Sequence, residues 1–347
     1  MLHYSKSILV LVALFVSSTL FAQSPSLYQD ENFIYRLDGQ HLVVKDYKHY
    51  HDSLKTEVTI PDFLEIDGEK VFVTVVDGCS GKYLERINLP ESLVSIEKAA
   101  FGGCINLEEI EFPNSLYSIG SGAFFGCSRL KKIYIPERVG MIGFNVFGKC
   151  TNLEEIKVSP KNKAYDSRDN CNAIIQTNIN VIIAGCKKTK ILKSVKEIAQ
   201  EAFYGCDIQK VVIPKNIKNI GAQAFGECKS MREVVIEKGC KEIGPYAFMC
   251  NHNLSKVTLP DGLLCLREGA FADCPNLNVL KVGKGLKEIG CGVFDPKIIE
   301  NNNFVFLVPR HWYWEHYYNL HTNICPKESI LFLRYPFNNF ERFYVEY

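Results

Sequence analysis

The sequence predicts an α/β solenoid: ~23-residue repeats stack into one parallel β-sheet with short helical or 3₁₀ turns opposite, and both ends are capped. Three observations predict it: a recurring phenylalanine, a strand-like pattern in each interval, and a cysteine after most of the phenylalanines. Because the period is fixed, the length of 347 residues counts stacked units and does not indicate two domains. The phenylalanines lie 23 residues apart, except for one interval of 22 and one of 56, at Phe101, Phe124, Phe147, Phe203, Phe225, Phe248, Phe271 and Phe294.

Each interval carries a strand followed by a turn. The segment from Leu107 to Phe112 ends in alternating apolar and charged residues, which is the pattern of a half-buried strand. Pro113 ends the strand because it cannot donate a hydrogen bond to a continuing ladder, and Gly120 then turns the chain. The Ala-Phe-x-x-Cys segment is too short for a stable helix, so we expect one helical or 3₁₀ turn whose Phe fills the interior.

The 56-residue interval contains an insertion from about Pro160 to Lys193. Two apolar runs, from Ala173 to Ile175 and from Val181 to Ala184, flank an Asn-rich turn and predict a β-hairpin. A hairpin that projects from the side of the solenoid is favoured over a dedicated binding loop. The second run could supply an additional rung.

The 14 cysteines suggest a disulfide framework until their spacing is compared with the repeat. Inward side chains that point in parallel make the disulfide dihedral hard to reach between neighbouring rungs, so we expect a column of buried thiols that pack as small hydrophobic residues. Cys171 and Cys186, which flank the insertion hairpin, are the one pair considered for a disulfide. The cysteines in or near the repeat position are Cys79, Cys104, Cys127, Cys150, Cys206, Cys228, Cys250 (one place early) and Cys274.

The first 22 residues predict a secretory signal peptide. Lys6 supplies the positive charge, the stretch from Ile8 to Val16 is apolar, and Ala22 precedes the expected cleavage site. The apolar stretch is shorter than the ~20 residues that a membrane span needs. We therefore expect export, to a secreted, periplasmic or cell-surface location, with no membrane span after cleavage.

The repeat unit Leu-x-x-Ile-x-Leu-Pro-x-x-Leu-x-x-Ile-x-x-x-Ala-Phe-x-x-Cys resembles the BspA-type leucine-rich repeat of bacterial surface proteins. The opening Val58-Thr59-Ile60-Pro61 and the closing Leu307-Val308-Pro309 are also similar to that family, so the resemblance covers about residues 30 to 325. Ser159, Glu237 and Gly283 depart from it, because they replace the proline that ends the strand. The resemblance implies a leucine-rich-repeat solenoid and adhesion to host or neighbouring-cell proteins.

These observations divide the chain into four parts. We expect a signal peptide over residues 1–22, an N-terminal β cap over 23–75, BspA-type repeats over 76–303 with the insertion hairpin at about 160–193, and a C-terminal aromatic-rich cap over 304–347. The last part holds both tryptophans, and covering the final rung is its default role. A carbohydrate-stacking patch is the alternative, formed by Trp312, Trp314 and Tyr317.

In each predicted strand, two residues flank an inward apolar residue and should point outward onto a concave sheet face. The first position alternates in charge from Arg86 to Lys256, which favours an ion ladder over a surface that reads a charged ligand. The second position becomes apolar toward the C-terminal half. The candidate binding residues are Arg86, Glu109, Lys132, Tyr134, Glu155, Lys157, Lys210, Val212, Glu233, Val235 and Lys256.

No acid pair, nucleophile–base set, glycine-rich phosphate loop or metal cluster stands out from the repeat, so we predict no enzyme, no cofactor and no metal. The balance of 40 Lys and Arg against 39 Asp and Glu lacks the basic excess of a nucleic-acid binder. We predict a monomeric, secreted or cell-surface protein that mediates protein–protein interaction, with a host or matrix protein as partner by family resemblance. The alternative is a carbohydrate-binding module that uses the C-terminal aromatic residues to hold a glycan.

Overall fold

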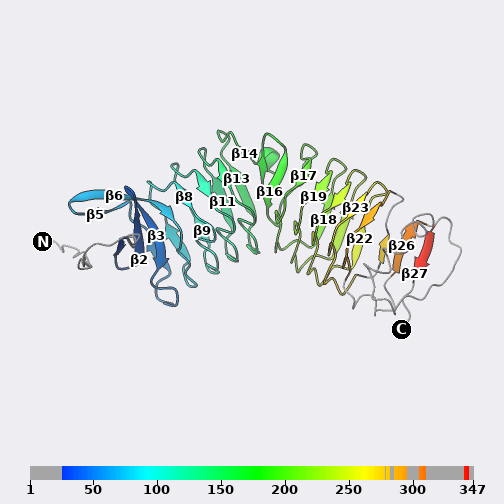
Figure 1. Ribbon diagram of the computed structural model, residues 1–347, viewed down its shortest axis with the longest axis horizontal. Coiled ribbons are helices and arrows are strands. Elements are labelled where there is room, and N and C mark those ends of the chain that lie inside the picture. Colours follow the sequence, from blue (N-terminus) through cyan, green and yellow to red (C-terminus); the bar gives the residue numbers. More distant parts are fainter. Residues whose placement is uncertain (1–25, 278, 282–284, 295–304, 310–339, 344–347) are drawn as a thin grey trace, which may run out of the picture.

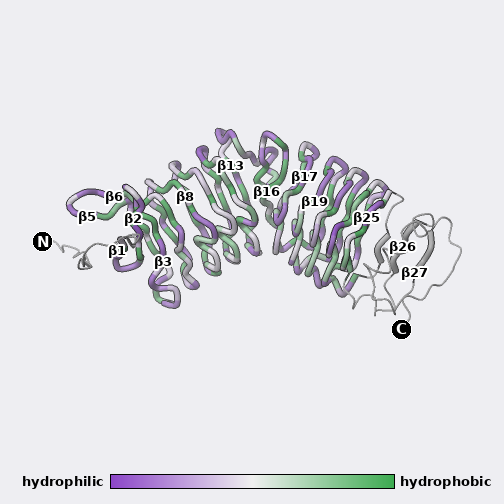
Figure 2. The backbone as a smooth tube through the Cα atoms, viewed as in Figure 1, coloured by the Kyte–Doolittle hydropathy of each residue, from purple (hydrophilic) through white to green (hydrophobic). Residues whose placement is uncertain are grey.

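The computed structural model describes residues 26–277, 279–281, 285–294, 305–309 and 340–343. The chain winds into a β-solenoid whose rungs stack along a curved axis (Figure 1). Figure 2 shows hydrophobic stretches along the rungs, separated by hydrophilic turns. Each rung has three sides, named here the first row, the second row and the turn side. Within the described residues, no helix has the length and apolar character that a membrane crossing requires.

The first row consists of parallel strands with the predicted alternation. In β11, Ile133 and Ile135 are buried while Lys132 and Tyr134 are exposed. The row forms three sheets, β4-β7-β9, β11-β13 and β18-β20-β22-β24-β26, and β27 (Phe340–Phe343) closes the last one in antiparallel orientation. Its strands in the repeats are β7 (Arg86–Asn88), β9 (Glu109–Ile110), β11 (Lys132–Ile135), β13 (Glu155–Val158), β18 (Lys210–Ile213), β20 (Glu233–Ile236), β22 (Lys256–Thr258), β24 (Val279–Lys281) and β26 (Val305–Pro309).

A second row of short parallel strands lies on another side of each rung, so the prediction of a single sheet is wrong. Only two residues per rung pair in this row, for example Ser118 and Ile119, which is too short for an alternating pattern to show in the sequence. Its strands in the repeats are β8 (Ser95–Ile96), β10 (Ser118–Ile119), β12 (Met141–Ile142), β17 (Glu197–Ile198), β19 (Asn219–Ile220), β21 (Glu242–Ile243), β23 (Cys265–Leu266) and β25 (Glu288–Ile289).

The turn side holds the Ala-Phe-x-x-Cys segments. We predicted a helical or 3₁₀ turn for each of them, but the described segments contain none. In the described residues the only helix is the 3₁₀ turn η1 (Arg168–Asn170), which lies in the insertion. The residues two before and two after each repeat Phe from Phe101 to Phe271 have positive φ, for example 53° at both Gln223 and Glu227. In each turn, alternate backbone N–H groups point along the solenoid axis and donate to the next rung. Phe225 therefore donates to the carbonyl of Ala247 in the next rung at 2.8 Å, while Gly226 donates within its own turn to Gln223.

The N-terminal segment extends both rows. In the sheet order β1-β2-β3-β6-β8, β6 pairs in parallel with the first repeat strand of the second row, and β4 pairs with β7 in the first row. Phe33, Tyr35 and Tyr47 are buried there, and the hydroxyl of Tyr35 donates to Asp30 at 2.6 Å. The strands are β1 (Leu27–Gln29), β2 (Phe33–Asp38), β3 (His41–Tyr47), β4 (Glu57–Thr59), β5 (Phe63–Ile66) and β6 (Glu69–Val76).

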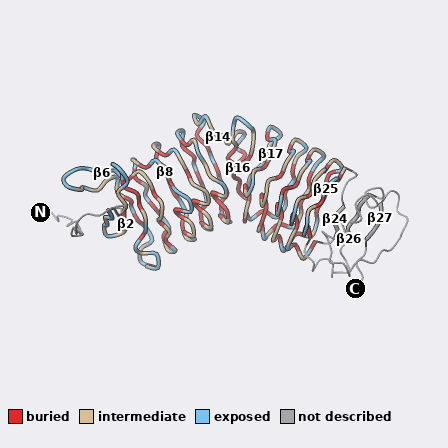
Figure 3. Tube along the Cα trace, in the orientation of Figure 1, coloured by how far each residue is buried: buried red, intermediate tan, exposed pale blue. Residues whose placement is uncertain are grey.

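The insertion forms the predicted hairpin, but the hairpin lies inside the solenoid and does not project from its side. It comprises β14 (Tyr165–Asp166), η1, β15 (Ala173–Gln176) and β16 (Val181–Gly185). Ala173, Ile174 and Ile175 are all fully buried, so both faces of β15 are covered. Ile174 packs in the core of the N-terminal half and Ile175 in that of the C-terminal half. The hairpin thus lies between the two cores and packs against both. Figure 3 shows buried segments at mid-length, near β16.

The insertion interrupts some sides of the solenoid but not others. The second strand of the hairpin, β16, adds a rung to the C-terminal half of the second row, because it pairs in parallel with β17, whereas β12 belongs to a different sheet. In the first row β13 and β18 belong to different sheets. The turn side continues, since the N–H of Lys149 donates to the carbonyl of Tyr204 at 2.9 Å. Lys149 also pairs with Glu227 at 2.8 Å and lies over the rings of Phe125 and Tyr204.

Stacked phenylalanine rings and cysteine thiols fill the two cores. Phe225 and Phe248, for example, stack with centroids 5.3 Å apart and ring planes at 3°. The column of thiols does more than fill space, because the Sγ atoms of four of them face a carbonyl of an earlier rung: Cys127, Cys150, Cys228 and Cys274. The distance is 3.2 Å from Cys127 to Phe101. No described cysteine forms a disulfide, and Cys171 and Cys186 are both buried thiols.

Candidate functional site

The candidate site is the outward face of the first row, where the predicted binding residues lie. Their inward neighbours, such as Ile133 and Val211, anchor them in the core, so the strand backbone fixes their direction. Glu155, Glu233 and Val235 are half-buried; the exposed members are Arg86, Glu109, Lys132, Tyr134, Lys157, Lys210, Val212 and Lys256. We call this surface the first-row face.

Strand register brings these residues together in separate groups. Before the insertion, Arg86 lies opposite Glu109, and further along the pairs are Lys132 with Glu155 and Tyr134 with Lys157. After the insertion, Glu233 lies between Lys210 and Lys256, and Val212 lies opposite Val235. No described first-row strand links the two halves, because β13 and β18 do not pair. The predicted continuous face is therefore divided at the insertion.

The predicted ion ladder forms after the insertion. The Glu233 carboxylate is 2.8 Å from the Lys210 ammonium and 3.2 Å from that of Lys256, and these two contacts hold the pKa of Glu233 below its ordinary value. Before the insertion, Glu155 pairs instead with Lys157 of its own strand at 2.6 Å, and this contact lowers the pKa of Glu155. Among the described residues, no ion pair joins Arg86 to Glu109 or Lys132 to Glu155.

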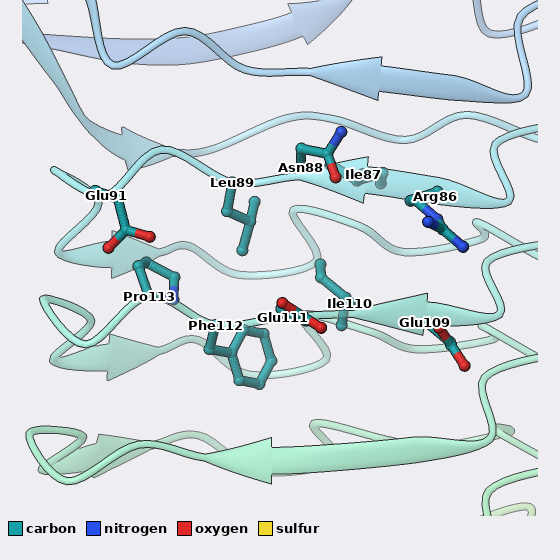
Figure 4. Close-up of a pocket in the computed structure, with 10 residues that line it drawn as sticks. All are labelled: Arg86, Ile87, Asn88, Leu89, Glu91, Glu109, Ile110, Glu111, Phe112 and Pro113. Atoms are coloured by element: carbon teal, nitrogen blue, oxygen red, sulfur yellow. The ribbon is translucent and has the colours of Figure 1, made fainter.

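A polar groove opens on the first-row face between β7 and β9, with a volume of about 270 Å³ (Figure 4). It forms because the pairing of the two strands ends at Ile87 and Ile110, beyond which the backbones lead into Pro90 and Pro113. Sequence reasoning missed this groove, although the repeated apolar-Pro pairs mark the place where the ladder must stop. Its lining residues are Arg86, Ile87, Asn88, Leu89, Glu91, Glu109, Ile110, Glu111, Phe112 and Pro113.

The other candidate chemistry is limited. In the part of the chain that the structure describes, no three His, Cys, Asp or Glu side chains gather in a way that could hold a metal ion. The predicted aromatic patch of Trp312, Trp314 and Tyr317 lies outside the described residues, so carbohydrate binding there stays a prediction. The site is therefore a charged and partly apolar surface, and the described residues show no metal-binding cluster on it.

Comparison with known proteins identifies the repeat. The model of the BspA type leucine-rich repeat region matches residues 77–195 and 196–306, in six copies. The chain belongs to the BspA-type leucine-rich repeat family. A comparison with curated proteins gives no significant match.

Several solved structures are similar to this BspA-type chain, and one of them has a TM-score above 0.5. The pneumococcal vaccine antigen PcpA has a TM-score of 0.52 and 20% identity, covering 78% of this chain and 86% of that one. A leucine-rich cell surface protein from Faecalibacterium prausnitzii has a TM-score of 0.36 and 18% identity, covering 79% and 87%. A leucine-rich repeat protein from Bacteroides ovatus has a TM-score of 0.38 and 19% identity, covering 80% and 96%. At 20% identity, the likeness to PcpA concerns the fold alone.

Proposed function

We propose that this BspA-type protein is an exported, non-catalytic interaction protein that binds a protein partner through its first-row face. The observation that carries the proposal is the pairing of Tyr134 with Lys157 on neighbouring strands. The Tyr134 side chain is 51% exposed although Ile133 and Ile135 on both sides of it are buried. A large aromatic residue that a rigid strand holds in solvent suits a partner surface, because tyrosine loses little conformational freedom on binding.

The surroundings of Tyr134 suit a protein partner as well. Lys132 and Lys157 flank it, which gives a charged rim around an aromatic centre. A second apolar position lies beyond the insertion, where Val212 is 46% exposed opposite Val235. The ion-paired Lys210 and Glu233 border it. These two patches are the places where we expect most of the binding energy.

Export and the absence of catalysis belong to the same proposal. Residues 1–22 have the pattern of a signal peptide, and the BspA-type repeat supports an extracellular or cell-surface role. In this family the repeat is scaffold, and the groove between β7 and β9 contains carboxylates and an arginine but no nucleophile with an adjacent base. A host or matrix protein is the partner that we expect.

A pulldown from solubilised extracellular matrix tests the proposal. The fourfold variant Lys132→Ala, Tyr134→Ala, Lys157→Ala and Lys210→Ala should reduce capture of the specific partner by about tenfold or more. The matched control removes one exposed tyrosine and three exposed lysines elsewhere: Tyr117→Ala, Lys82→Ala, Lys98→Ala and Lys229→Ala. Equal capture by the wild type, the variant and the control would overturn the assignment of the first-row face.

A further inference from the structure

Six lysines form two columns along one corner of the solenoid, in three consecutive rungs that begin where the insertion ends. Each of these rungs carries a Lys-x-x-Lys segment that precedes its second-row strand, β17, β19 or β21. The apolar residue before the second lysine is Val195, Ile217 or Cys240, and it is buried in every case. The lysine columns are Lys193, Lys215 and Lys238, and Lys196, Lys218 and Lys241, and all six side chains are exposed.

Backbone contacts fix the spacing of the columns. The N–H of Lys218 donates to the carbonyl of Lys196 at 2.8 Å, and Lys241 donates to Lys218 at the same distance. Neighbouring lysines of this column therefore lie about one strand spacing, ~4.8 Å, apart at their backbones. In the other column the rungs also pack closely, because a Cβ at Gly239 would come within 1.7 Å of the Lys215 carbonyl oxygen.

The charges of the lysine columns are not neutralised by ion pairs with described residues. The acidic residues nearby in sequence have other partners. Glu242 pairs with Arg267 at 2.8 Å, and Glu197 accepts a hydrogen bond from Asn219 at 2.8 Å. Glu237 accepts from the backbone N–H of Lys215 at 3.0 Å, and the Lys241 ammonium donates to the carbonyl of Gly262 at 3.1 Å. The corner therefore presents a surplus of positive charge.

This arrangement works against the stability of the fold. Like charges on neighbouring strands repel each other, whereas the first-row face alternates in sign from Lys210 to Glu233 to Lys256. The same corner in the N-terminal half carries no lysine columns. Its corresponding residues include Glu91, Val94, Tyr117 and Glu137. Because the solenoid forms without lysines at this corner in its N-terminal half, the lysine columns call for another explanation, and a ligand of opposite charge would provide one.

We propose that the lysine columns bind a linear anionic polysaccharide, carboxylated or sulfated, that lies along the solenoid axis. The columns run along that axis at about one strand spacing, ~4.8 Å, per lysine, so a linear polymer that carries regularly repeated negative charges can meet several lysines at once. The columns contain no aromatic residue, on which single-stranded nucleic acid would stack, and no large apolar side chain to enter a bilayer. This inference goes beyond the proposed function and uses a different surface.

Binding of size-defined heparin and polygalacturonate oligosaccharides to the full chain tests the proposal. We expect binding that weakens steeply with added salt. The triple variant Lys196→Gln, Lys218→Gln and Lys241→Gln should weaken it by roughly 10-fold or more. The control Lys82→Gln, Lys98→Gln and Lys229→Gln removes the same charge from exposed positions outside the columns and should change it less than about twofold.

Two further measurements make the result decisive. Without ligand and at low salt, the triple variant should melt at the same temperature as the wild type or higher, because it loses like-charge repulsion; this excludes misfolding as the cause of lost binding. Neutral dextran, phosphatidylserine vesicles and double-stranded DNA serve as competing probes. Tighter binding to the vesicles or DNA, or an equal effect of the control variant, would overturn the polysaccharide assignment. No measurable binding of either acidic oligosaccharide at low salt would overturn it as well.

Discussion

The side-chain amide nitrogen of Asn251 lies 3.0 Å from the carbonyl oxygen of Phe225, one rung earlier. In other rungs a cysteine thiol makes this contact, as Cys228 does with Phe203 at 3.1 Å. Asn251 therefore occupies the cysteine position of its rung. The neighbouring Cys250 takes the left-handed position of the turn, with φ 56°. The amide also donates to Phe248 at 2.8 Å, but its oxygen is buried without a partner.

Replacing Asn251 tests the role of this position. Asn251→Cys removes the buried unpaired oxygen and keeps a donor to Phe225, so we expect the free energy of unfolding to rise by about 1 kcal/mol. Asn251→Ala leaves both carbonyls without the side-chain donor and should lower it by about 1–3 kcal/mol. Urea denaturation of the two variants measures both changes. If Asn251→Cys were as destabilising as Asn251→Ala, the thiol would not be an equivalent donor.

Gly185, at the end of β16, should not tolerate a side chain. A Cβ there would lie 2.0 Å from Cε1 of Phe203, whose ring is buried in the C-terminal core. Gly185→Ala is expected to lower the free energy of unfolding by about 1–3 kcal/mol through overpacking. Gly262→Ala is the control, because its Cβ would meet only the flexible end of Lys241 at 3.2 Å. Similar denaturation midpoints for both variants would contradict the close packing of Phe203 on the hairpin.

The buried thiols should react slowly in the folded protein. Burial raises the pKa of Cys228 to about 12 and that of Cys240 to about 11, so neither forms the nucleophilic thiolate near neutral pH. Of the described cysteines only Cys291 is exposed, and we expect it to react first with an alkylating reagent. Mass spectrometry over time gives the order. After denaturation without reductant all described cysteines should react; pairs that need a reductant first would show disulfides instead.

Glu154 provides a titration test of the contact between its rung and the insertion. Its carboxylate is 2.5 Å from Lys188 and 2.9 Å from Lys187, and these lysines, Lys188 first, lower its pKa to about 2. The pKa of Glu154 in the folded protein lies below its unfolded value of about 4.3. The stabilisation of the fold by this ion pair is therefore fully present above about pH 4.3 and is lost as the pH falls through about 2. A carboxyl-detected NMR titration should show this low pKa.

The same titration on Lys187→Gln with Lys188→Gln supplies the comparison. Without the two ammonium groups, the pKa of Glu154 should return toward about 4.3. High salt should shift the wild-type value in the same direction, because the side chains of Glu154 and Lys188 are 42% and 60% exposed to solvent. A low pKa that persists in the double variant would mean that another group holds it.

Much of the fold could be predicted because the residues that recur with the repeat are those whose side chains pack in the core. The spacing of Phe225 and its equivalents gives the rung length, and the alternation at Lys132, Ile133 and Tyr134 gives the buried and exposed faces. The second row and the turn conformation could not be predicted. Two-residue strands such as β10 are too short to produce an alternating pattern in the sequence. Non-glycine residues such as Gln223 take positive φ only because contacts with the next rung hold them there.

The candidate site was predicted less completely than the fold. Outward residues such as Lys132 and Tyr134 follow from strand alternation, whereas the division of their face depends on where the hairpin inserts. The lysine columns were missed because the net charge of the chain is close to zero, which hides opposite charges on different surfaces. The Lys-x-x-Lys segments at 193–196, 215–218 and 238–241 are the signal that could have revealed them.

Because β15 belongs to both cores, the two halves of the solenoid are coupled mainly through a single hairpin and the turn side. In a linear array, cooperativity passes from one unit to the next, and it is weakest where the interface is smallest. The chain should therefore unfold through an intermediate in which one half is melted and the other half remains folded. In such an intermediate, each half would keep its own patch of the first-row face, so partial denaturation would separate the two patches as independent binding units.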